Sequence, residues 1–98
     1  MTAKEGRIAT RPYRVRAGGV WYWVDPTVPP ADIEPDDTVV IYPRSGEATL
    51  AILKSEFRPG EGASAVQPVA FSTLEGERFE IPAHDIATLH LAAVDEQQ

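Results

Sequence analysis

The sequence contains no cysteine, so disulfides and thiolate-bound metals are excluded. It also has no long apolar run. The longest uninterrupted stretch, residues 20–24, is far shorter than the roughly 20 residues that a membrane-spanning helix needs. Residues 1–12 lack the apolar segment of a secretory signal peptide. These absences predict a soluble, cytoplasmic protein that makes no membrane contact.

Positive charge is scarce as well. The 98 residues include 9 Lys and Arg against 15 Asp and Glu, which gives a net charge of −6. A protein that binds a phosphate backbone needs a basic face, so this balance argues against nucleic acid as a partner. The hydrophobic fraction of 43% is ordinary for a soluble globular protein, and the length suits one domain with a modest core.

What the sequence does contain is a series of short apolar or alternating segments, separated by turns rich in glycine and proline. This spacing is typical of a small β fold. The predicted strands are residues 13–16, 20–24, 38–42, 47–57, 66–73, 78–81 and 86–94. The predicted fold class is therefore mainly β: a small, partly open barrel or a two-sheet β fold of about seven short strands, with little helix.

The composition also predicts the domain organisation. Residues 1–10 are expected to form a flexible N-terminal arm, residues 11–94 a single β domain, and residues 95–98 a frayed tail. Four of the nine prolines lie within residues 25–35, which excludes a regular helix or a central strand there. We expect an irregular loop with a single helical turn in that segment, and a disordered loop at residues 58–64.

A Gly-Gly pair between the first two predicted strands indicates a β-hairpin. Trp21 and Trp23 lie two positions apart on the second strand and therefore point to the same face. Arg14 and Arg16 lie on the partner strand, from which they can stack on the indole rings. Trp, Tyr and Arg are enriched in binding hot spots, so we predict that these four residues and Tyr13 form a contact surface. A role for the tryptophans in the core remains the alternative.

The sequence also contains carboxylates and histidines, which are common metal ligands. Four carboxylates precede the third predicted strand: Asp32, Glu34, Asp36 and Asp37. They lack the glycine turn and the distal glutamate of a calcium loop, so we interpret them as solvated or capping groups. His84 and His90 are too far apart along a strand to share a metal. We expect His84 in a turn and His90 on a half-exposed strand face, with no metal and no cofactor.

The most informative stretch is residues 35–53, Pro-Asp-Asp-Thr-Val-Val-Ile-Tyr-Pro-Arg-Ser-Gly-Glu-Ala-Thr-Leu-Ala-Ile-Leu. It resembles the core hairpin of the self-cleaving domains of LexA, UmuD and phage repressors. Residues 76–82 and 89–94 are similar to the closing strands of those domains. In that family the second hairpin strand carries the lysine of a Ser–Lys dyad, and here Ala51 stands at the matching position. The resemblance therefore implies the scaffold of that family without its catalytic lysine.

The remaining lysines do not restore such a dyad. Lys4 lies in the predicted arm, and Lys54 is three positions after Ala51, so strand alternation places it on the opposite face. In the loop that corresponds to the family's serine, Thr27 is a poor substitute. An active Ser–Lys peptidase is therefore not expected.

The resemblance implies a non-catalytic protein-interaction or regulatory module, similar to the dimerisation domain of LexA-like repressors. Its partner would be another protein or a second copy of the chain. Two alternatives remain open. One is an SH3-like small barrel that binds a peptide on Trp21 and Trp23, and the other is a small acidic accessory or inhibitor protein of mobile-element (phage) origin.

Overall fold

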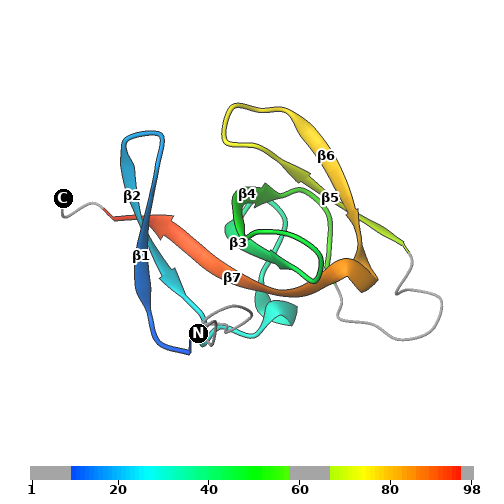
Figure 1. The fold of residues 1–98 in the computed structure, drawn as a ribbon, viewed down its shortest axis with the longest axis horizontal. Coiled ribbons are helices and arrows are strands. Elements are labelled where there is room, and N and C mark those ends of the chain that lie inside the picture. Colours follow the sequence, from blue (N-terminus) through cyan, green and yellow to red (C-terminus); the bar gives the residue numbers. More distant parts are fainter. Residues whose placement is uncertain (1–9, 58–66, 96–98) are drawn as a thin grey trace.

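The computed structural model describes residues 10–57 and 67–95. These residues form a single antiparallel sheet of seven strands, in the spatial order β1-β2-β7-β3-β4-β5-β6 (Figure 1). The strands are β1 (Tyr13–Ala17), β2 (Val20–Asp25), β3 (Thr38–Pro43), β4 (Thr49–Leu53), β5 (Pro68–Ser72), β6 (Arg78–Pro82) and β7 (Ile86–Val94). The mainly β prediction is confirmed. Within the described residues the sheet does not close into a barrel, and β1 and β6 are its two edges.

Strand β7 connects the two parts of the sheet. It pairs with β3 over residues 38–43 and with β2 over residues 22–25. Figure 1 shows β7 running from the β3–β6 part of the molecule to the β1–β2 hairpin, which stands at the opposite side. The last strand of the chain therefore determines where the first hairpin is held.

The sheet buries apolar side chains on both of its faces, because successive residues of a strand point to opposite sides. The larger core comprises Ile33, Val39, Ile41, Ala51, Leu53, Phe57, Val69, Phe71, Ile86 and Leu89. The smaller core comprises Val24, Val40 and Ala92, with Tyr13, Val15, Tyr42 and Leu50 packed against it. The adjacent residues Val39 and Val40 thus belong to different cores, which explains why this strand is apolar at every central position.

The turn of the first hairpin follows directly from its glycines. Gly18 and Gly19 have φ values of 60° and 79°, and a two-residue type I′ turn requires positive φ at both positions. Ala17 and Val20 lie opposite each other and close the turn. The hairpin and its register are therefore encoded locally.

The observed elements differ from the predictions mainly at their ends. The strand predicted at residues 47–57 is limited to Thr49–Leu53, and the Ser55 hydroxyl beyond it accepts the Ala70 N–H at 3.0 Å. The proline-rich loop contains one turn, the 3-10 helix η1 (Pro30–Asp32), as expected. Residues 1–9 of the predicted arm and the loop at residues 58–64 lie outside the described residues, as do residues 96–98 of the predicted tail.

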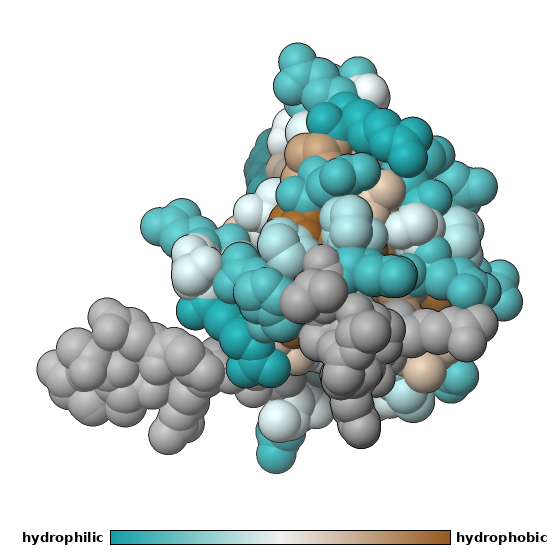
Figure 2. Space-filling model, turned by 90° about the vertical axis from the view of Figure 1, so that its right-hand side faces the viewer, coloured by the Kyte–Doolittle hydropathy of each residue, from teal (hydrophilic) through white to brown (hydrophobic). Residues whose placement is uncertain are grey.

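The described part of the chain contains no helix long and apolar enough to cross a membrane. Figure 2 shows the side of the molecule that lies at the right of Figure 1, away from the β1–β2 hairpin. This surface is mainly hydrophilic, and hydrophobic residues are visible only in small areas between polar side chains. The described residues visible on this side form no broad apolar patch.

Candidate binding surface

One face of the β1–β2 hairpin brings together four of the predicted binding residues, Arg14, Arg16, Trp21 and Trp23. The register places Arg14 opposite Trp23 and Arg16 opposite Trp21. The Cζ atoms of Arg14 and Arg16 lie 4.6 Å and 5.6 Å from the centroid of the Trp21 ring. Two cations therefore cover one indole ring, and we refer to these four residues as the Arg–Trp surface.

The Arg–Trp surface lies outside both cores. Trp23 is 47% exposed, and neither tryptophan belongs to the buried clusters of the described residues. A cation–π contact at an exposed site contributes about 0.5–1 kcal/mol, which favours arginine side chains ordered over the ring. The indole of Trp23 is left accessible beside them.

A carboxylate already occupies one end of this surface. The Oδ2 atom of Asp95 lies 2.9 Å from Nε of Arg14, and the Asp95 N–H donates to the Trp21 carbonyl at 2.9 Å. Asp95 directly follows β7, so the ladder between β7 and β2 continues by one more hydrogen bond. The contact shows that a backbone-anchored carboxylate fits beside Arg14.

Tyr13 lies on the other face of the hairpin and does not line the Arg–Trp surface, because it occupies the alternate position in β1. Its hydroxyl forms a hydrogen bond with the hydroxyl of Tyr42 on β3 and lies 3.2 Å from Nδ1 of His90 on β7. The ring centroids of Tyr42 and His90 are 4.6 Å apart. We refer to Tyr13, Tyr42 and His90 as the Tyr–His cluster, which joins three strands.

The prediction that His90 is half-exposed is wrong, since its exposed fraction is 3%. The sequence shows only a histidine between Leu89 and Leu91. The tyrosine that covers it, Tyr13, is 77 residues away and is brought over β7 by the hairpin. A polar residue inside an apolar strand was the one signal that could have indicated burial.

The environment of the Tyr–His cluster favours its uncharged form. Burial lowers the pKa of His90 below its ordinary value of 6.5, and the carboxylate of Asp25 offsets only part of this shift. The ring is therefore neutral near pH 7, and its Nδ1 shares a hydrogen bond with the Tyr13 hydroxyl. The pKa of Tyr13 is raised, first by burial and then by its hydrogen bond with Tyr42. The cluster thus links β1 to β3 and β7, and the shifts of Tyr13 and His90 both favour the neutral form.

Two of the four clustered carboxylates of the proline-rich loop, those of Asp36 and Asp37, have structural partners. The Glu34 N–H donates to Oδ2 of Asp37 at 2.9 Å, and Lys54 Nζ lies 2.8 Å from Oδ1 of Asp36. Across residues 10–57 and 67–95, no three His, Asp or Glu side chains converge in a way that could hold a metal ion. His84 lies in the short 3-10 helix η3 (Ala83–Asp85), in agreement with the predicted turn.

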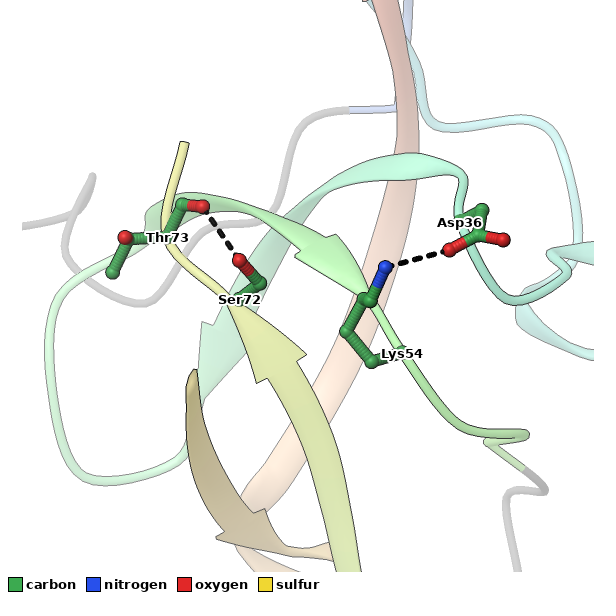
Figure 3. Close-up of polar contacts among 4 residues, drawn as sticks. All are labelled: Asp36, Lys54, Ser72 and Thr73. Atoms are coloured by element: carbon green, nitrogen blue, oxygen red, sulfur yellow. Dashed lines mark hydrogen bonds and ion pairs between the residues drawn. The ribbon is translucent and has the colours of Figure 1, made fainter. Parts of the chain in front are cut away.

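Lys54 is the only lysine in the described part of the chain, and its side chain starts on the same face as that of Ser72. Ser72 lies opposite Ile52, and Lys54 follows two residues later. The two polar groups turn apart (Figure 3): Lys54 reaches Asp36, whereas the Ser72 hydroxyl donates to the Thr73 carbonyl at 2.8 Å. A Ser–Lys dyad needs a buried, neutral lysine, but the Lys54 side chain is 38% exposed and paired with a carboxylate.

The Thr27 hydroxyl is held in a turn of its own. It donates to Oδ1 of Asp25 at 2.6 Å, and the Thr27 N–H donates to the same oxygen at 2.9 Å. These hydrogen bonds stabilise the carboxylate and lower the pKa of Asp25. The position of Thr27 is explained by this turn, which begins the loop after β2.

Comparisons with known proteins do not assign the chain to a family. No family model matches the chain, and no curated protein or solved structure is significantly similar to it. The resemblance to the LexA-like domains therefore stays a prediction.

Proposed function

We propose that this protein is a non-catalytic interaction or regulatory module that binds a protein partner through the Arg–Trp surface. The observation that carries the proposal is the exposed Trp23 beside an indole covered by two arginines. The other large hydrophobic residue that the described chain exposes, Val94 at 50%, lies at the end of β7, opposite Tyr22 of the β1–β2 hairpin. Both exposed apolar side chains therefore lie at one end of the molecule.

The residue types of this surface also support binding. Trp and Arg dominate hot spots because they combine a large contact area with directional polar contacts. The hairpin holds them on a strand pair, so less side-chain and backbone freedom is lost on binding than on a loop. The SH3-like alternative would use the same exposed tryptophan and differs from this proposal in the identity of the partner.

We expect Trp23→Ala to weaken partner binding about 30-fold or more, the effect of removing a hot-spot side chain worth about 2 kcal/mol. Immobilised wild-type and variant proteins would be incubated with a cell extract, and the retained proteins quantified by mass spectrometry. Circular dichroism should show an intact fold, since Trp23 is outside both cores. Two charge variants are compared. Arg16→Glu changes the Arg–Trp surface, and Arg78→Glu is the control at an exposed arginine on β6.

The proposal is supported if one set of proteins is lost from both Trp23→Ala and Arg16→Glu but is retained by Arg78→Glu. It is contradicted if the hairpin variants retain the same proteins as the wild type. Unfolding of Trp23→Ala would also contradict it, because that result would assign the tryptophan to the core.

The non-catalytic proposal also makes a prediction for Lys54, which a peptidase would need as its base. An exposed ion pair contributes about 0–1 kcal/mol, so we expect Lys54→Ala to leave the free energy of unfolding nearly unchanged. We also expect the purified wild-type and variant proteins to stay intact over days, as followed by electrophoresis and intact-mass measurement. Time-dependent cleavage of the wild type that disappears in Lys54→Ala would overturn the non-catalytic proposal.

A further inference from the structure

We propose that the partner contributes an acidic, extended segment that pairs antiparallel with the outer edge of β1 and adds a further strand to the sheet. This inference rests on the proposed function and specifies what the hairpin binds. Within residues 10–57 and 67–95, β1 pairs only with β2, so its outer side is open. Strand addition at an edge is a general mode of peptide recognition, in which the backbone supplies affinity and alternate side chains supply specificity.

The hairpin register shows which backbone groups face outward. In a two-residue hairpin the closing pair, here Ala17 and Val20, exchanges both backbone hydrogen bonds, and the bonding then alternates along the strands. Arg14 and Arg16 are therefore in non-hydrogen-bonded pairs with β2, and their N–H and C=O groups point away from it. The Trp21 carbonyl agrees with this alternation, because it accepts the Asp95 N–H on the side away from β1.

The usable edge is short. Pro12 would occupy the next outward position before β1, and it has no N–H to donate. Gly18 begins the turn at the other end. The edge thus presents the donors of Arg14 and Arg16, which suits a segment of a few residues rather than a long strand.

The side chains on the two faces of β1 indicate which residues the partner segment should contain. Residues directly opposite each other in a sheet share a face, so partner residues opposite Arg14 and Arg16 lie on the Arg–Trp surface, where acidic groups form charge-assisted hydrogen bonds. Partner residues at the intervening positions lie on the other face, beside the partly buried Tyr13 and Val15 of the smaller core. The expected partner sequence alternates acidic and apolar residues.

The charges favour this occupant over a second copy of the chain. Antiparallel pairing of β1 with another β1 would place arginines opposite arginines, and like charges directly opposite are destabilising. The other edge strand, β6, exposes Arg78 and Glu80. Their charges are opposite, so this edge favours neither an acidic nor a basic segment. Asp95, bound to Arg14 at 2.9 Å, shows the type of group that the Arg–Trp surface accepts.

The net charge of −6 disfavours binding of a long polyanion more than binding of a short acidic peptide. Beyond about 8–10 Å charges are largely screened at physiological salt, so the local balance of two arginines against the one carboxylate of Asp95 can dominate the field felt by a short peptide. A nucleic acid carries charge over a much longer path and would meet the acidic remainder of the surface.

The test uses a fluorescein-labelled heptapeptide of alternating glutamate and valine, titrated with the full chain and followed by fluorescence polarisation. We expect saturable binding that weakens with added NaCl and weakens at least about tenfold in the Arg14→Glu/Arg16→Glu double variant. Arg78→Glu, the matched change on the other edge strand, should bind like the wild type. A lysine–valine heptapeptide should not bind.

N-methylated peptides test strand addition itself. In antiparallel pairing the glutamates opposite Arg14 and Arg16 direct their N–H groups to β1, while the valine N–H groups point outward. Methylation of the glutamate nitrogens should therefore reduce affinity about tenfold or more, and methylation of the valine nitrogens should have little effect. Equal binding of both methylated peptides would overturn the inference, and so would the absence of any binding by the unmodified peptide.

These outcomes are distinguishable from failure of the proposed function. If extract proteins still depend on Trp23 and Arg16 while the glutamate–valine peptide does not bind, the surface is an interface for a different kind of partner. Light scattering during size-exclusion chromatography measures whether the chain forms a dimer. A dimer that Arg14→Glu/Arg16→Glu abolishes would assign the edge to a second copy and overturn the acidic-segment inference.

Discussion

Phe71→Ala is expected to lower the free energy of unfolding by about 3–5 kcal/mol, as is typical when a large buried aromatic side chain is truncated. Phe71 lies on β5 and is fully buried, at 0% exposure, in the larger core. Its ring stacks on that of Phe79, with centroids 5.5 Å apart and an interplanar angle of 20°. Because small domains are stable by only about 5–15 kcal/mol, the variant should be close to the limit of folding.

Urea denaturation followed by circular dichroism measures this effect. Phe79→Ala is the matched control, since it removes the same ring from a partly buried position on β6. We expect a smaller loss for Phe79→Ala than for Phe71→Ala. Equal or reversed losses would show that the larger core is not centred on Phe71.

Lowering the pH from about 7.5 to 5 is expected to destabilise the protein through His90. The pKa of His90 is lowered in the folded state relative to its ordinary value of 6.5, so the unfolded chain binds the proton more tightly. Stability therefore rises with pH wherever the unfolded state binds more protons. The contribution of the neutral ring is complete above about pH 6.5 and declines as the pH falls toward the lowered pKa.

The experiment compares urea midpoints across this pH range for the wild type, His90→Gln and His84→Gln. His90→Gln should lose the part of the pH dependence that lies near pH 6. His84→Gln should keep it, because His84 is exposed in η3 and makes no contact with the Tyr–His cluster in the described structure. If all three proteins have the same pH dependence, protonation of His90 is not its cause.

The sequence by itself determined the features that depend on neighbouring residues. Alternation and turn residues predicted seven strands and a mainly β fold, because the two-residue period of a strand is a local property. The Gly-Gly turn fixed the first hairpin, and that hairpin alone was enough to place Trp21 and Trp23 on one face with Arg14 and Arg16. The core hairpin of β3 and β4 was predicted from the same kind of signal.

Only the tertiary structure decided which distant segments lie together. No local pattern shows that β7 inserts between β2 and β3, and that insertion buries His90 under Tyr13 and Tyr42 and brings Asp95 to Arg14. It also separates Tyr13 from the tryptophans, and among the described residues no strand pairs with the outer side of β1. Strand order depends on how the whole chain buries its apolar surface and pairs its backbone groups, so it is a property of the complete fold rather than of any segment.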